Sequence, residues 1–141
     1  MVAKKIHESL DGDIELISEQ VSRKGIVGWL KTGSGNSKRE IAKIDETQYD
    51  PIDYDLVILA SPIWAGTMSS PMRGYITENR KKLGRTAVFL TNDSGVVDNA
   101  FIEVRGLLVN PPLVEGSLQR SKIKTELEST MNTFIEKVSS L

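Results

Sequence analysis

The sequence predicts a single α/β domain in which helices cover both faces of a parallel sheet. Two apolar runs without alternation, residues 55–60 and 85–91, have the pattern of strands that are buried on both faces. Segments with apolar residues at helical spacing follow both runs. Strands that alternate with amphipathic helices form parallel sheets with helices on either side. Because 141 residues is the size of one compact domain, residues 1–141 are expected to be a single domain.

The N-terminal part predicts a short helix and a short strand. The helix is expected over Val2–Leu10, because an apolar residue recurs at every fourth position and an Asp-Gly pair follows. The alternating segment Asp13–Ser18 predicts a strand with Ile14 and Leu16 on one face. Residues 19–53 show the least regular pattern of the chain.

The middle of the chain predicts two buried strands and the start of a helix. The first strand, Asp55–Ala60, is expected to end in a loop of residues 61–69. Ser70 then supplies an N-cap, and the proline after it suits the first helical position. The second strand, Arg85–Thr91, is expected to lead into a turn over Asn92–Gly95.

The C-terminal part predicts a helix, a short strand and a final helix. Apolar residues between Ala100 and Leu108 recur at helical spacing. Leu113 and Val114 form the apolar part of a short strand. From about Ser121 onward, one face of the last helix is expected to be apolar.

Composition excludes several classes of function. The 18 Lys and Arg residues balance 19 Asp and Glu residues, whereas nucleic-acid binding normally needs a basic excess. The chain has no cysteine and one histidine, His7, so thiolate chemistry, a zinc-thiolate site and a Ser-His dyad are not expected. His7 itself is expected to face solvent. No apolar run is long enough to span a membrane and no signal-peptide core is present, so a soluble cytoplasmic protein without a metal is expected.

The loops after the two buried strands are the expected ligand site. In open parallel sheets, ligands bind at the carboxyl ends of the strands. Here these loops are residues 61–69 and 92–96, which are rich in Ser, Thr, Gly and Asn. They offer hydroxyls and backbone N–H groups to a ligand. No residue pattern for acid–base or nucleophilic catalysis accompanies them, so the chemistry would have to come from a bound cofactor.

One stretch of the chain resembles a known family. Residues 54–71, YDLVILASPIWAGTMSSP, closely resemble the third strand and following loop of the flavodoxin family, and the similarity continues to the strand Thr86–Leu90. The resemblance over the rest of the chain is weaker. It implies a three-layer α/β/α fold with strand order 2-1-3-4-5 and an FMN held by three loops at the strand ends. The first loop wraps the phosphate, and the loops after strands three and four hold the isoalloxazine ring.

The resemblance implies a set of cofactor-binding residues in the two ring-binding loops. The set consists of Ser61, Pro62, Ile63, Trp64, Ala65, Gly66, Thr67, Thr91, Asn92, Asp93, Ser94 and Gly95. Trp64 would stack on the flavin, where aromatic pairs gain about 0.5–1.5 kcal/mol beyond area burial. Gly95 would permit close backbone approach, Asn92 would offer its amide, and Asp93 would lower the flavin potential.

Each of these residues also has a plainer interpretation. Trp64 can cap the end of the sheet or face a partner, and Gly66 can serve a tight turn. Asp93 or Ser94 can be the N-cap of the following helix. The polar segment Thr32–Lys38 resembles a phosphate turn in its letters, but its alternative is a flexible polar loop.

The chain departs from the family at its N-terminal end. Met1–Ile6 corresponds to the middle of the first helix, so the first strand and the phosphate turn are missing. Three explanations stay open: a start further upstream, a truncated paralogue, or a fold completed by another subunit. The missing central strand would leave unpaired ladder groups or force a rearrangement, and an open edge favours association into a homo-oligomer.

Two functions follow as hypotheses. The first is a flavodoxin-like FMN protein that carries electrons to a redox partner protein, or a small flavin oxidoreductase that reduces a small-molecule acceptor. The second is a cofactor-free module of the same fold that acts in assembly or protein interaction. The missing phosphate turn is the argument for the second, because each charge-assisted phosphate contact is worth about 1.5–3 kcal/mol.

Overall fold

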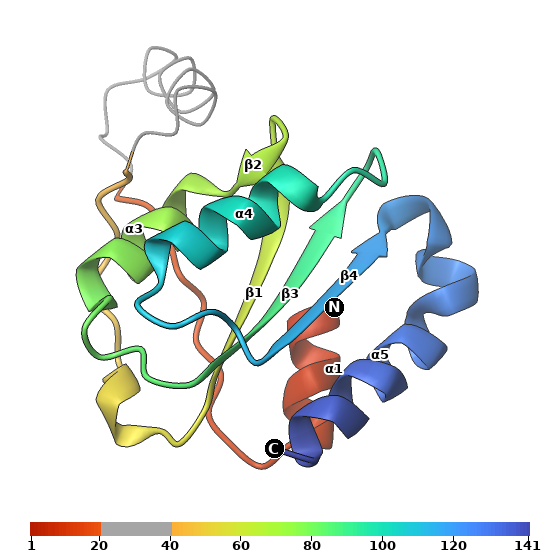
Figure 1. The fold of residues 1–141 in the computed structure, drawn as a ribbon, viewed down its shortest axis with the longest axis horizontal. Coiled ribbons are helices and arrows are strands. Elements are labelled where there is room, and N and C mark those ends of the chain that lie inside the picture. The colour runs from red at the N-terminus through yellow and green to blue at the C-terminus, as the bar shows by residue number, and fades with distance from the viewer. Residues whose placement is uncertain (21–40) are drawn as a thin grey trace.

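The computed structural model describes residues 1–20 and 41–141 and shows helices on both faces of a sheet (Figure 1). The irregular region after residue 20 and the polar segment Thr32–Lys38 lie, wholly or in large part, outside the described residues. The elements in chain order are α1 (Val2–Ser9), the 3₁₀ turn η1 (Pro51–Asp53), β1 (Val57–Trp64), β2 (Thr67–Met68), α3 (Ser70–Asn79), β3 (Thr86–Asn92), α4 (Asp98–Leu107), β4 (Val114–Gln119), the 3₁₀ turn η2 (Arg120–Lys122) and α5 (Ile123–Ser139).

The described sheet has four strands in the order β2-β1-β3-β4. β1 and β3 pair in parallel from Val57 opposite Thr86 to Pro62 opposite Thr91. β3 and β4 also pair in parallel, whereas the two-residue β2 pairs antiparallel with the end of β1. The predicted α/β fold is therefore confirmed, and β1, β3 and β4 lie side by side as the resemblance implies for strands three, four and five.

The two faces of the sheet carry separate apolar clusters. α3 and α4 cover one face, and α1 and α5 cover the other (Figure 1). The first cluster centres on fully buried side chains such as Ile76, Leu90 and Val104, and the second on Phe89 and Met131. Burying one such side chain stabilises the fold by about 1.5–3 kcal/mol. β3 contributes to both clusters because it lies between β1 and β4, as its continuous apolar run predicts.

Close packing behind β3 requires a glycine in β4. The rings of Phe89 on β3 and Phe134 on α5 meet edge to face, with centroids 5.1 Å apart. A Cβ placed on Gly116 would lie 2.8 Å from carbon atoms of both rings. Gly116 thus lets the C-terminal helix pack directly on the sheet.

The predicted strand over Asp13–Ser18 is wrong. The segment is extended, but its ladder contact is one antiparallel bridge between Glu19 and Ile44. Leu16 is 87 % exposed and Ile14 is 43 % exposed, so they do not form a buried face. Ile17 instead packs against the α3–α4 cluster. Alternation alone predicts a strand only where a partner strand lies alongside, and the described chain places none there.

Element boundaries also differ from the predicted ones. β1 extends through Trp64, so residues 61–64 belong to the strand and not to a loop. α3 begins at Ser70 itself, and its N-cap is Ser69. α1 ends at Ser9, and the C-terminal helix begins at Ile123 after a 3₁₀ turn. These shifts of one to four residues move no element to another face of the sheet.

Candidate functional site

A tight β-hairpin, not an open loop, follows the first strand of the sheet. Trp64 pairs with Thr67 across a two-residue turn. The turn residues Ala65 and Gly66 have φ values of 50° and 78°. Positive φ at both central residues is the type I′ geometry, whose twist matches that of the flanking strands. The predicted turn role of Gly66 is confirmed, because a left-handed conformation at this place suits glycine.

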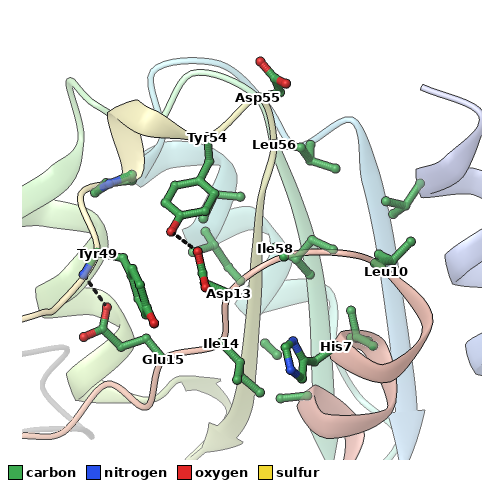
Figure 2. Close-up of a pocket in the computed structure, with 18 of the residues that line it drawn as sticks. His7, Leu10, Asp13, Ile14, Glu15, Tyr49, Tyr54, Asp55, Leu56 and Ile58 are labelled. Carbon is green, nitrogen blue, oxygen red and sulfur yellow. Dashed lines mark hydrogen bonds between the residues drawn. The ribbon is translucent and has the colours of Figure 1, made fainter.

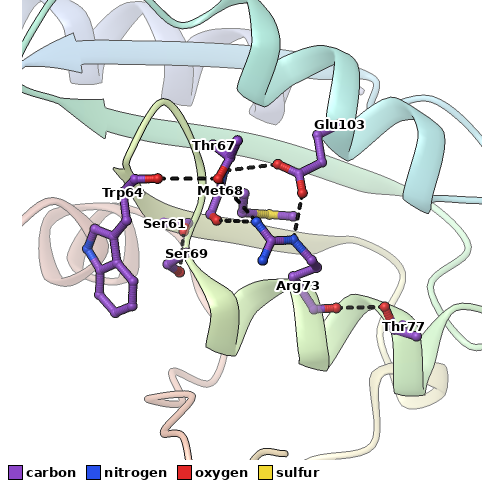
Figure 3. Close-up of polar contacts among 8 residues, drawn as sticks. All are labelled: Ser61, Trp64, Thr67, Met68, Ser69, Arg73, Thr77 and Glu103. Atoms are coloured by element: carbon purple, nitrogen blue, oxygen red, sulfur yellow. Dashed lines mark hydrogen bonds and ion pairs between the residues drawn. The ribbon is translucent and has the colours of Figure 1, made fainter. Parts of the chain in front are cut away.

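A buried ion pair fixes this hairpin to both covering helices (Figure 3). Arg73 Nε on α3 lies 2.6 Å from Glu103 Oε1 on α4, and the two side chains are 3 % and 7 % exposed. Arg73 Nη2 donates to the carbonyl of Met68 at 2.9 Å and to the hydroxyl of Thr67 at 3.2 Å. The other oxygen of Glu103 accepts the backbone N–H of Met68 at 3.1 Å. The polar groups of β2 are thus satisfied by charged side chains from below.

Thr67 and Ser61 face the interior of the hairpin. The Thr67 hydroxyl donates to the carbonyl of Trp64 at 3.3 Å, and the hydroxyls of Ser61 and Ser69 lie 2.8 Å apart. Both Ser61 and Thr67 are buried. Their side chains therefore brace the hairpin.

The turn after β3 is held by its own side chains. Asn92 Oδ1 accepts the backbone N–H of Gly95 at 2.6 Å, and Gly95 has a φ of 82°. Gln119 at the end of β4 donates to the carbonyl of Asp93 at 3.0 Å. The alternative that Asp93 or Ser94 caps the next helix is wrong, because α4 begins at Asp98 after the N-cap Val97. The longer turn separates the two residues from the helix.

A cavity of about 450 Å³ lies between the ends of β1 and β3 and the N-terminus of α1. The predicted site residues that line it are Ser61, Pro62, Ile63, Trp64, Thr91, Asn92 and Asp93. Ala65, Gly66, Thr67, Ser94 and Gly95 lie in the two turns and do not line it. The structure thus brings both predicted segments to one cavity at the carboxyl ends of the parallel strands.

Trp64 combines exposure with a fixed backbone. Its side chain is 39 % exposed and lines this cavity. The type I′ turn and the Arg73–Glu103 pair hold the strand from which the indole projects (Figure 3). A half-exposed indole on a rigid support presents an aromatic face at little entropic cost.

Several lining residues were not predicted from the sequence. They are Met1, Val2, Ala3, Ala60, Phe89, Arg120 and Ile123. Arg120 follows the last parallel strand, so the rule that ligands bind at carboxyl ends of strands was a signal for it. The guanidinium lies 3.6 Å from Asp93, and both side chains are more than 70 % exposed. α1 begins at this cavity without a side-chain cap for its first N–H groups, and such groups attract anions.

Comparisons of the fold with solved structures agree on one class of protein. A flavoprotein from Lactobacillus acidophilus NCFM, crystallised in complex with FMN, is 20 % identical with a TM-score of 0.54, over 92 % of this chain and 87 % of that chain. A flavoprotein from Bacteroides eggerthii DSM 20697 is 15 % identical with a TM-score of 0.64, over the same shares of the two chains. The chain has a flavodoxin-like fold.

A third structure supports the same fold assignment. The NMR structure of the apo-form of the Lactobacillus acidophilus flavoprotein is 16 % identical with a TM-score of 0.55, over 88 % of this chain and 85 % of that chain. No protein-family model and no curated protein matches the sequence. Within residues 1–20 and 41–141, no helix is long and apolar enough to cross a membrane.

Proposed function

We propose that this flavodoxin-like chain binds FMN in the cavity between the ends of β1 and β3 and the start of α1, and serves electron transfer or flavin-dependent reduction. The observation that carries the proposal is the convergence of Trp64, the Asn92 turn and the α1 N-terminus on one cavity. Its volume of about 450 Å³ is within the range of small-molecule sites. The solved flavoprotein that was crystallised with FMN supports this choice of ligand.

The lining residues suit the different parts of such a ligand. Trp64 and Ile63 offer an aromatic and an aliphatic surface to a planar ring. The uncapped N–H groups of α1 and the guanidinium of Arg120 favour a negatively charged group. Thr91 and Asn92 add polar groups at the end of β3. A bound flavin would supply the redox chemistry, and these residues would orient it and exclude water from one side.

The reaction partner follows from the exposure of the site. Trp64 and Arg120 are both exposed, so a flavin edge in this cavity would remain accessible from solvent. The partner would be a redox protein that docks here or a small-molecule acceptor. We infer neither nucleic acid nor membrane as a partner, since the 18 basic and 19 acidic residues nearly balance.

The second candidate is a cofactor-free module for protein interaction. Among the described residues, Arg120 is the one basic side chain that lines the cavity, and no phosphate-wrapping turn precedes α1 in the sequence. Weak phosphate binding would follow, because several charge-assisted hydrogen bonds would be missing. FMN affinity separates the two candidates.

The test is a titration of the purified chain with FMN, followed by quenching of flavin fluorescence. We expect saturable binding with a Kd below about 10 μM, which corresponds to roughly 7 kcal/mol. Trp64→Ala is expected to weaken binding about tenfold, because a stacked aromatic contact is worth about 0.5–1.5 kcal/mol beyond its buried area. Trp64→Phe is the matched control and should retain most of the affinity.

Riboflavin, which lacks the phosphate, completes the experiment. If Arg120 and the α1 N-terminus bind the phosphate, riboflavin should bind more weakly than FMN, and Arg120→Gln should reduce that difference. Absence of saturable FMN binding to a folded chain would favour the interaction module. Equal FMN affinity of the Trp64→Ala variant would contradict the role of the indole.

A further inference from the structure

A second cavity, of about 530 Å³, opens along the free edge of β1 (Figure 2). One wall is β1 itself, with Leu56, Ile58 and Ala60 among the lining residues. The opposite wall is the segment of residues 10–17, which leads from α1 past β1 to the other layer. His7 lies at the α1 end of the cleft and is exposed, as predicted.

The backbone of β1 has unused hydrogen-bonding groups in this cleft. Between Val57 and Pro62, β1 pairs with β3 and with no other strand of the described chain. The N–H of Val57 donates to the carbonyl of Arg85, which precedes β3, at 3.0 Å. Because successive residues of a strand direct these groups to opposite edges, those of Ile58 and Ala60 point into the cleft. A row of such groups is a template for another strand.

Both layers beside this edge are apolar. Leu56 and Ile58 pack against the α1–α5 cluster together with Leu10. Val57 and Ile17 pack against the α3–α4 cluster. A strand in the cleft would direct alternate side chains into the two clusters. Its residues would therefore have to be apolar without interruption, as in strands covered on both faces.

Polar contacts at the rim hold the outer wall in place. The Tyr54 hydroxyl donates to Asp13 Oδ2 at 2.6 Å, and Glu15 accepts backbone N–H groups of Gln48 and Tyr49 (Figure 2). These bonds tie the segment of residues 10–17 to the chain that precedes β1. The wall encloses the cleft from outside, which suits one inserted strand better than the whole sheet edge of a second copy.

We propose that this cleft is a docking site for an extended apolar peptide segment of another polypeptide, which pairs with the free edge of β1. Main-chain hydrogen bonds to Ile58 and Ala60 supply affinity, and the two apolar layers select the side chains. About six residues would span the stretch from Val57 to Pro62, which is roughly 20 Å long in a strand. The site is separate from the proposed cofactor cavity in its chemistry and is tested without FMN.

The experiment measures peptide binding by fluorescence anisotropy. The probe is a fluorescein-labelled peptide of six alternating Val and Ile residues flanked by two Lys residues at each end. We expect saturable binding to the folded chain. A peptide of the same sequence with N-methylated amides at alternate residues keeps its apolar side chains but loses the donors on one edge. It should bind at least tenfold more weakly if β-pairing is the mode of binding.

Two variants of the protein locate the binding site. Ile58→Lys places a charge at the wall of the cleft and should reduce affinity at least tenfold. Ile102→Lys is the control, since Ile102 is exposed on α4, away from the cleft, and this variant should bind the peptide unchanged. Circular dichroism of both variants verifies that they are folded.

Three results would overturn the proposal. The first is no saturable binding of the unmodified peptide. The second is equal binding of the two peptides, or of the Ile58→Lys variant if it folds, because that would indicate unspecific apolar adsorption. The third is a dimer in sedimentation equilibrium that the peptide does not dissociate, because a second copy would then be the occupant. A negative FMN titration leaves this test unaffected, since neither the probe nor its readout includes a flavin.

Discussion

Ala65 adopts a backbone conformation that L-amino acids rarely adopt. Its φ of 50° lies in the left-handed region, at the first central position of the β1–β2 turn. This conformation costs an ordinary residue about 1–2 kcal/mol. Asparagine is preferred there in type I′ turns, because its side chain bonds locally and tolerates left-handed angles. Strain at this turn is therefore relieved by one substitution.

We expect Ala65→Asn to raise the free energy of unfolding by about 0.5–1 kcal/mol. Ala65 is exposed, so the new side chain meets no packing constraint. Urea denaturation monitored by circular dichroism is the measurement. Ala65→Val is the matched control and should destabilise the chain, because a β-branched residue is strongly disfavoured at positive φ. Equal stabilities of the two variants would contradict the assigned turn.

At the scale of elements, the Arg73–Glu103 pair determines where the hairpin lies relative to α3 and α4. Both side chains are buried and both bond to the backbone or side chains of β2. Removing one partner of a buried pair leaves an uncompensated charge, which costs about 3–5 kcal/mol. Because the hairpin carries Trp64, a shift of β2 also changes the proposed cofactor cavity.

We expect Glu103→Gln to lower the free energy of unfolding by about 3 kcal/mol, through loss of the charge that faces Arg73. Urea denaturation measures the effect. The exposed pair Arg105–Glu115 joins α4 to β4, and Glu115→Gln is the control, with an expected loss below about 1 kcal/mol. A positioning role for Arg73 and Glu103 predicts weaker FMN binding by Glu103→Gln under conditions where the variant is still folded. Unchanged affinity would restrict the pair to stability.

The elements differ in how well the sequence predicted them, for physical reasons. β1 and β3 were predicted because a strand covered on both faces must be apolar throughout. The β1–β2 hairpin was missed because Ala65 replaces the asparagine that usually marks a type I′ turn. The strand expected at Asp13–Ser18 failed because alternation does not reveal whether a partner strand is present.

The candidate site shows the same division. Its two strand-end segments were predictable from topology, whereas the approach of α1 and Arg120 depends on how distant elements pack. The buried Arg73–Glu103 pair also joins two helices that are separate in the sequence. No local pattern marks such a pair, since charged residues usually lie on solvated helix faces.

At the scale of the whole molecule, the bond between Tyr54 and Asp13 couples the fold to alkaline pH. It ties the N-terminal segment to the chain that precedes the sheet. This hydrogen bond raises the pKa of Tyr54 from 10.0 to about 12. The folded state therefore holds the phenolic proton more tightly than the unfolded state. The resulting stabilisation is complete below pH 10 and is lost as the pH rises from 10 toward 12.

Comparison with Tyr54→Phe isolates this contribution, because Tyr75, whose pKa is raised by burial, titrates in both proteins. We expect the wild-type chain to be the more stable at about pH 8, and this advantage to shrink at about pH 11, above the ordinary tyrosine pKa of 10.0. Urea denaturation at the two pH values measures both differences. Asp13→Asn keeps an acceptor but removes the negative charge, so its stability should fall less steeply than that of the wild type over this interval. An advantage over Tyr54→Phe that is the same at both pH values would mean that the phenol retains no extra affinity for its proton in the folded chain.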